Sequence, residues 1–107
     1  MSKQQSPIIH GTVIINATGI SSPVDVSEAT RVFVGCNSLA GQVTNVEGSF
    51  DDVTWANLHI ATSITTLQMV GGIGPQIFGV EESVPMLRFN VASIVAANTL
   101  TLPVYGV

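Results

Sequence analysis

The residue types that could carry chemistry are few in this chain and lie scattered along it. Metal ligation or acid–base catalysis would have to draw on seven acidic residues, two histidines and one cysteine among 107 residues. A calcium loop needs several oxygen ligands at fixed short spacing around a glycine turn, and no segment follows that pattern. We interpret the acidic residues of the expected loops as solvated turn carboxylates: Asp25, Glu28, Asp51, Asp52, Glu81 and Glu82.

The two histidines and the cysteine lack the spacing of a zinc site or of a nucleophilic triad. No C-x-x-C or H-x-x-x-H pair occurs, and neither histidine lies in a catalytic motif. Alternation places the His59 side chain on the other face of the strand from Leu58 and Ile60, so His59 is predicted to face solvent or an interface. His10 is expected in a mobile lead-in to the first strand, and Cys36 is expected to be a buried small apolar residue. The sequence therefore predicts no enzyme, no metal and no cofactor.

The charge balance limits the partners of this chain. Only 9 % of its residues are charged, and its net charge is −4, whereas a typical soluble domain carries about 25 % charged residues. Beyond Lys3 the only cations are Arg31 and Arg88, too few for a protein that tracks nucleic-acid phosphates. No apolar run reaches the roughly 18 residues of a membrane helix. The first residues also lack the apolar segment of a signal peptide, so we expect synthesis in the cytoplasm and neither a nucleic-acid nor a membrane partner.

The elements that must position these residues are predicted to be β-strands. Thr, Val and Ile make up about a third of the chain, and these residues pack well on a pleated sheet. Short apolar segments bounded by turn residues are typical of a sandwich. We predict an all-β chain with a single β-sandwich, jelly-roll or Ig-like, over residues 8–107 and a short flexible polar arm over residues 1–7. The expected strands cover residues 11–17, 23–26, 31–36, 42–50, 54–61, 64–70, 76–80, 86–94 and 99–105.

A period of two is clear in the segment 86–94. Leu87, Phe89 and Val91 are predicted to face the core, while Arg88 and Asn90 face outward. A buried core strand is therefore expected at this position.

The last strand repeats this alternation with Leu100, Leu102 and Val104 toward the core. Pro103 interrupts its outward positions and cannot donate a hydrogen bond to a neighbouring strand. We therefore predict that this strand lies at a sheet edge, or that Pro103 sits at a bulge or on the non-bonded side. An uncovered edge invites another chain.

The aromatic residues are assigned mainly to the core. Core positions on the expected strands are predicted for Phe33, Phe50, Phe78 and Phe89. Trp55 follows a turn and is interpreted as a lid over the core. The alternative is a sugar-binding surface in which Trp55, Tyr105 and the loop at residues 71–75 contact a glycan.

Three segments resemble small virion proteins of tailed bacteriophages. Residues 43–55 read VTNVEGSFDDVTW, with a strand ending in V-x-V-E-G-S, an Asp-containing hairpin and then a strand carrying Trp. Residues 84–91 read VPMLRFNV, and a short turn then leads to a Thr- and Val-containing strand at residues 99–105. The pattern has glycine where this chain has Asp52, which leaves room for a longer loop. The resemblance implies a small β-sandwich of the virion.

The function implied by this resemblance is that of a capsid decoration, or cement, protein, which stabilises the phage head by bridging neighbouring capsomers. We expect a homo-oligomer, trimer or dimer, located in the virion, whose partner is the major capsid protein or another virion protein. The alternative is a tail or head-surface binding module that contacts host glycans. Contacts with neighbouring chains are expected at Lys3, Gln4, Gln5, Trp55, His59, Pro103 and Tyr105.

Overall fold

Segments rich in β-branched residues form strands throughout the part of the chain that the computed structural model describes, which comprises residues 8–36, 42–60, 66–68, 76–95 and 99–107. The elements formed within these ranges are all β-strands, and none is a helix long and apolar enough to cross a membrane. The predicted all-β class is therefore confirmed. The expected arm, with Lys3, Gln4 and Gln5, and the loop at residues 71–75 lie outside the described ranges.

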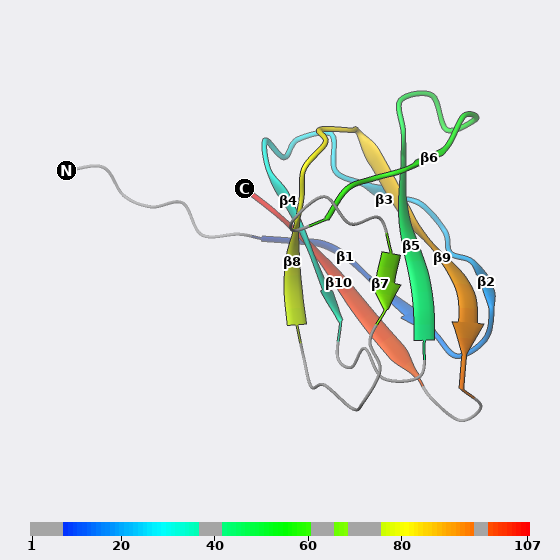
Figure 1. Ribbon diagram of the computed structural model, residues 1–107. Coiled ribbons are helices and arrows are strands. Elements are labelled where there is room, and N and C mark those ends of the chain that lie inside the picture. The colour runs from blue at the N-terminus through cyan, green and yellow to red at the C-terminus, as the bar shows by residue number, and fades with distance from the viewer. Residues whose placement is uncertain (1–7, 37–41, 61–65, 69–75, 96–98) are drawn as a thin grey trace.

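Sheet A joins segments from both ends of the chain. Its antiparallel strands follow the order β1-β10-β4-β8, so β1 and β8 are its edges. Figure 1 shows the blue β1 lying beside the red β10. The four elements are β1 (Ile8–Ile15), β10 (Leu100–Gly106), β4 (Val32–Cys36) and β8 (Gln76–Val80).

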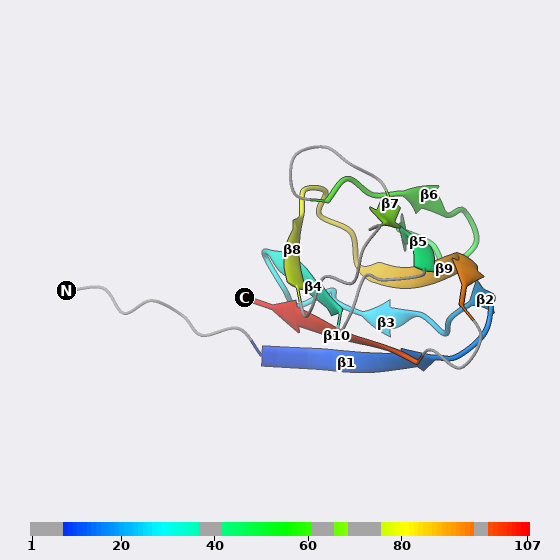
Figure 2. The ribbon, with the colours of Figure 1, turned by 60° about the horizontal axis from the view of Figure 1, so that its bottom comes forward.

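Sheet B is centred on two long antiparallel strands, β9 (Met86–Ile94) and β5 (Gln42–Ser49). The short strands β2 (Gly19–Ile20) and β3 (Val24–Asp25) pair with β9, and β6 (Ala56–Asn57) and β7 (Thr66–Gln68) pair with β5. Figure 2 shows sheet B lying over sheet A, the arrangement of a single β-sandwich.

The core lies between the two sheets. Leu87, Phe89 and Val91 of β9 are buried, and so is Cys36 at the end of β4, as predicted. The inward positions of β10 are buried too, which confirms the alternation predicted there. The cluster of buried apolar residues consists of Val24, Val26, Val32, Val34, Cys36, Val46, Leu58, Ile60, Leu87, Phe89, Val91, Leu100, Leu102 and Val104.

The prediction that the last strand is an edge is wrong. β10 lies between β1 and β4, with Pro103 opposite Thr12 of β1. Pairing with β4 covers only Val104 to Gly106, so the ladder on that side begins directly after Pro103, which lacks an N–H. Sheet A therefore accommodates Pro103 in an interior strand by ending one ladder beside it.

The segment predicted as one strand over residues 54–61 has a different role. Within its described residues, 54–60, only the strand β6 forms, and the chain then crosses from sheet B to sheet A. The Leu58 N–H donates to Val46 O of β5 at 2.8 Å, and Ile60 forms a bridge with Val80 of β8. We call residues 58–60 the crossing segment. It covers part of the outer edge of β8.

Candidate functional site

Apolar side chains gather on the outer face of sheet A. Ile9 of β1 lies opposite Tyr105 of β10, which in turn lies opposite Phe33 of β4. Because residues directly opposite share a face and Tyr105 follows the buried Val104, this row points away from the core. The term apolar face denotes the outward side chains Ile9, Ile14, Phe33, Ile77, Pro103 and Tyr105.

The isoleucines of the apolar face are strongly exposed. The exposed fractions are 59 % for Ile9, 69 % for Ile14 and 65 % for Ile77. Single exposed apolar side chains need no explanation, but a contiguous set on one face marks a contact surface.

Two glycines, Gly35 and Gly79, leave space for the rings of the apolar face to lie close to the sheet. A Cβ on Gly35 would lie 2.9 Å from Pro103 Cγ and 3.5 Å from Tyr105 Cε2, so these rings lie over bare backbone. Gly79 lies opposite Phe33 and leaves its ring a similar space. The face is therefore formed by rings lying close to the sheet, between the exposed isoleucines.

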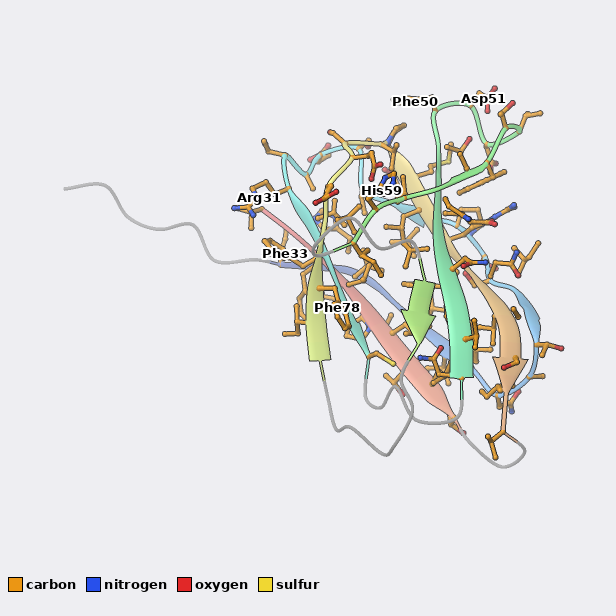
Figure 3. The ribbon with its side chains drawn as sticks, in the orientation of Figure 1. Arg31, Phe33, Phe50, Asp51, His59 and Phe78 are labelled. Atoms are coloured by element: carbon orange, nitrogen blue, oxygen red, sulfur yellow. The ribbon has the colours of Figure 1, made fainter. Side chains whose placement is uncertain are left out.

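Charge is almost absent from this side of the molecule. The four strands of sheet A contain no Asp, Glu, Lys or Arg. Arg31 lies just before β4, and its guanidinium stands 5.2 Å from the centroid of the Phe33 ring; both residues are labelled in Figure 3. The apolar face thus has one cation at its border.

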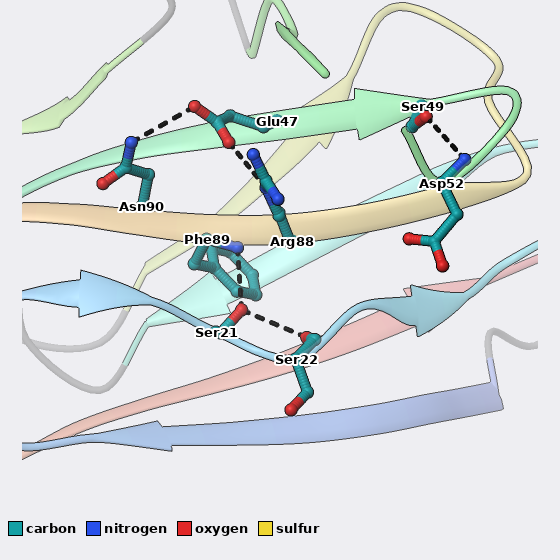
Figure 4. Close-up of polar contacts among 8 residues, drawn as sticks. All are labelled: Ser21, Ser22, Glu47, Ser49, Asp52, Arg88, Phe89 and Asn90. Carbon is teal, nitrogen blue, oxygen red and sulfur yellow. Dashed lines mark hydrogen bonds and ion pairs between the residues drawn. The ribbon is translucent and has the colours of Figure 1, made fainter. Parts of the chain in front are cut away.

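The outer face of sheet B has the opposite character. Arg88 Nε donates to Glu47 Oε1 at 2.7 Å, and Asn90 Nδ2 donates to Glu47 Oε2 at 3.3 Å (Figure 4). The Arg88 guanidinium also lies 4.1 Å from the centroid of the Trp55 ring, within cation–π range. Polar groups on this face are therefore satisfied within the chain, in contrast to the exposed isoleucines of sheet A.

Comparison of the chain with protein-family models, curated proteins and solved structures finds no match. The two outer faces of the sandwich differ in character, with paired polar groups on sheet B and exposed isoleucines on sheet A.

The residues predicted as contacts do not form one site. Pro103 and Tyr105 belong to the apolar face, whereas Trp55 lies on the outer face of sheet B and His59 lies on the crossing segment. Trp55 covers Arg88 and not the core, so its assignment as a core lid is wrong. Since Trp55 and Tyr105 lie on opposite faces of the sandwich, they cannot contact the same glycan unit.

Two of the four phenylalanines predicted for the core lie elsewhere. Phe89 is buried, and Phe78 packs against the core from β8. Phe33 points outward, and Phe50 is 77 % exposed because β5 ends at Ser49 and the chain turns there. Figure 3 shows Phe50 at the tip of the hairpin, away from Phe33 and Phe78.

Three members of the apolar face, Ile9, Ile14 and Ile77, were not singled out by the sequence patterns. In β1 both alternating sets are apolar, since Val13 and Ile15 pack against the core while Ile14 is exposed. Alternation identifies a core face only when the other face is polar. The feature of the sequence that could have indicated this face is the lack of charged residues in all four strands of sheet A.

The loop carboxylate of Asp51 accepts hydrogen bonds from backbone N–H groups of its own loop. Asp51 Oδ1 accepts hydrogen bonds from the N–H groups of Thr54 at 2.8 Å and Val53 at 2.9 Å, which lower the pKa of Asp51 below its ordinary value of 3.8. Asp52 follows with a φ of 62°, the left-handed conformation for which glycine is best suited and which Asp tolerates. Ser49 Oγ accepts the Asp52 N–H at 3.0 Å (Figure 4), which completes the turn.

Asp25 forms a second turn of this kind. Its Oδ1 accepts the hydroxyl of Ser27 at 2.6 Å and the Ser27 N–H at 2.9 Å, and these bonds lower the pKa of Asp25. Within the described ranges no group of three or more His, Cys, Asp and Glu side chains is placed to hold a metal ion.

His10 lies inside β1 and not in a mobile lead-in, so that prediction is wrong. It occupies a bulge, since the register shifts between Ile9 and Gly11. A Cβ on Gly106 would collide with the His10 imidazole and with Ala29, so the ring packs closely over the end of β10. His10 is thereby fixed by packing.

His59 pairs with Glu82 at the edge of β8. The imidazole Nδ1 contacts Glu82 Oε2, and the His59 N–H donates to Glu82 Oε1 at 2.6 Å. The hydrogen bond and charge of Glu82 raise the pKa of His59 above 6.5, and the charge of Glu81 adds to this. Burial raises the pKa of Glu82, but the bonds from the His59 side chain and N–H outweigh it and leave this pKa below 4.5. Both side chains are partly exposed, so the pair is an ion pair of modest strength.

The His59–Glu82 pair is expected to make thermal stability depend on pH. A raised His59 pKa adds stability below pH 6.5 that is lost as pH rises through the folded value, and a lowered Glu82 pKa adds stability above pH 4.5 that is lost as pH falls through its folded value. The contribution is therefore largest between these limits. Calorimetry of the wild type and of His59→Gln should show a Tm difference there that shrinks toward about pH 9. A constant difference across this range would contradict the assignment.

Proposed function

We propose that this protein is a non-enzymatic structural protein of a virion, a capsid decoration protein that attaches through the apolar face and bridges neighbouring capsomers. The observation that carries the proposal is the exposure of Ile9, Ile14 and Ile77 on one uncharged sheet face. The resemblance of residues 43–55 and 84–91 to small phage virion proteins supports it independently.

The size of the apolar face explains why such a protein would act in many copies. Four strands of up to eight residues, spaced about 4.8 Å apart with about 3.3 Å per residue, give a face of roughly 400–500 Å². Its burial contributes at most about 10 kcal/mol, because the exposed Thr12 shares this face, and this is similar to the estimated cost of association of about 4–15 kcal/mol. One contact is therefore weak, whereas contacts repeated across a shell reinforce one another.

Attachment is expected to fail when a charge is placed on the apolar face. Ile77→Lys puts a cation on the outer side of β8, where the exposed side chain leaves the fold intact. Binding to undecorated shells of the parent virus should fall by about 10- to 100-fold, the equivalent of about 1.5–3 kcal/mol for one buried isoleucine. Co-sedimentation with purified shells measures this.

The matched control is Val53→Lys, which changes another exposed aliphatic residue in the hairpin, 81 % exposed and away from the apolar face. It should bind shells as the wild type does. Equal binding by both variants would contradict attachment through sheet A, and equal loss would indicate a nonspecific effect of the added charge.

Glycan binding remains the second candidate, favoured by a groove beside the hairpin. The groove has a volume of about 580 Å³, within the range of small-molecule sites. Leu58 and Val84 line it, Asn57 and Glu82 supply polar groups, and the exposed Phe50 borders it. A glycan-array signal that Phe50→Ala abolishes would favour this function over attachment to a shell.

A further inference from the structure

We infer that two copies of this protein pair along β1, so that their two A sheets join into one antiparallel sheet across a two-fold axis. The partner is a second copy of this chain, and the contact is made by backbone hydrogen bonds at the sheet edge. The role given below to the enlarged surface rests on the proposed function, but the pairing itself does not.

The outer edge of β1 is open to such pairing. β1 pairs with β10 on one side, and no strand in the described ranges pairs with its other side. The nearby β3 approaches from within the sandwich, because Val24 lies 3.1 Å from the position of a Cβ on the inward-facing Gly11. In Figure 2, β1 forms the margin of the molecule, with the rest of both sheets on one side of it.

Apart from its bulge, β1 lacks the features that keep sheet edges apart. Natural edges carry charged side chains, proline or bulges, or are covered. Ile8–Ile15 contains no charged residue and no proline, and only the bulge near Ile9 interrupts it. By contrast, the end of β8 next to Glu81 is covered by the Ile60–Val80 bridge and by the Glu81 N–H donating to His59 O at 2.8 Å. Among the described residues, the edge of β1 is therefore the longer uncovered edge of sheet A.

The lack of charged side chains along β1 makes this edge a place where two copies can approach each other. With a net charge of −4, two copies repel each other over much of their surface. Along β1 no like charges oppose one another, and two identical strands of this composition are compatible. An antiparallel pair of identical strands is a self-complementary contact and closes at two copies.

The pleat of β1 fixes how the strands meet. Residues directly opposite each other must share a face, and Gly11–Ile15 is the regular stretch beyond the bulge. Centring the pair on Val13 places each Val13 opposite its counterpart and each Thr12 opposite Ile14 of the second copy. Because the two-fold axis is then perpendicular to the sheet, both apolar faces point to the same side.

Pairing would give the apolar face the size of a stable contact surface. A single face of roughly 400–500 Å² is smaller than the roughly 800 Å² per partner of standard interfaces. Two faces joined through β1 reach about 800–1,000 Å². The dimer, and not the single chain, would then be the unit that attaches to a shell.

Two double variants test both the pairing and its register. Thr12→Lys with Ile14→Lys places lysines opposite lysines across the two-fold axis, and Thr12→Lys with Ile14→Glu places lysines opposite glutamates. Both positions are exposed on the outer face, so neither substitution enters the core. The mass of each full-length protein is measured by light scattering across a dilution series without shells, and circular dichroism checks the fold.

We expect the wild type to have twice the 11.2 kDa mass of the chain. The lysine–lysine variant should dimerise at least about tenfold more weakly, and the lysine–glutamate variant should recover a dimer. A wild-type monomer at all concentrations, a trimer, or equal masses for the two folded variants would overturn the pairing. A monomer that still attaches to shells would overturn the pairing alone, whereas a dimer that does not attach would overturn the proposed function alone.

Discussion

Phe89→Ala is expected to lower the free energy of unfolding by about 3–5 kcal/mol. Phe89 has no exposed surface, lies at the centre of β9, and has its backbone N–H bonded to Ser21 Oγ at 2.9 Å. Removing its ring leaves a cavity between two sheets whose paired backbones resist collapse. Domains of this size have total stabilities of about 5–15 kcal/mol, so the variant loses a large share. Urea unfolding followed by circular dichroism measures the change.

Phe50→Ala is the matched control, because it removes the same ring from a position that is 77 % exposed. Its effect should stay within about 0.5 kcal/mol, as for surface substitutions generally. Similar losses for the two variants would show that the hairpin tip is packed against other residues. A small loss for Phe89→Ala would contradict its place in the core.

Gly48→Ala is expected to lower the free energy of unfolding by about 1–3 kcal/mol through overpacking. A Cβ at this position would lie 2.7 Å from Val84 Cγ2 and 2.8 Å from Leu58 Cδ2. Leu58 is buried and its N–H is bonded to Val46 O, so the crossing segment cannot yield freely. The same unfolding measurement applies.

Gly79→Ala provides the comparison for Gly48→Ala. Its Cβ would meet the Phe33 ring at 3.7 Å, an ordinary contact distance, with no backbone strain. Because glycine inside a strand costs about 0.5–1 kcal/mol relative to alanine, this variant should be unchanged or more stable. If both glycine variants lost equal stability, close packing around Gly48 would not be the cause.

The positions and the inward residues of β9 and β10 could be predicted from the sequence. In β9, buried Leu87, Phe89 and Val91 alternate with Arg88 and Asn90, which bond to Glu47. A polar outer face makes alternation easy to interpret. Turn chemistry was equally informative at Asp51, whose carboxylate bonds two backbone N–H groups of the predicted hairpin.

The members of the apolar face could not be predicted, because apolar residues occupy both sides of sheet A. In β4, buried Val32 and Val34 flank Phe33, which is outward-facing, and the types alone do not separate the two roles. The order of the strands in sheet A could not be predicted from the sequence either. Pro103 favoured an edge, but one ladder simply ends beside it, and β10 becomes an interior strand.

The pairing of the first described strand with the last has a consequence for how the protein folds during synthesis. β1 has its only paired neighbour among the described residues in β10, which is about 90 residues later in the chain. Contacts so distant in sequence close slowly, on the millisecond-to-second scale typical of β-sandwiches. The β1–β10 ladder of sheet A therefore cannot form until the ribosome has released β10, and during the synthesis of the residues between them β1 lacks this partner.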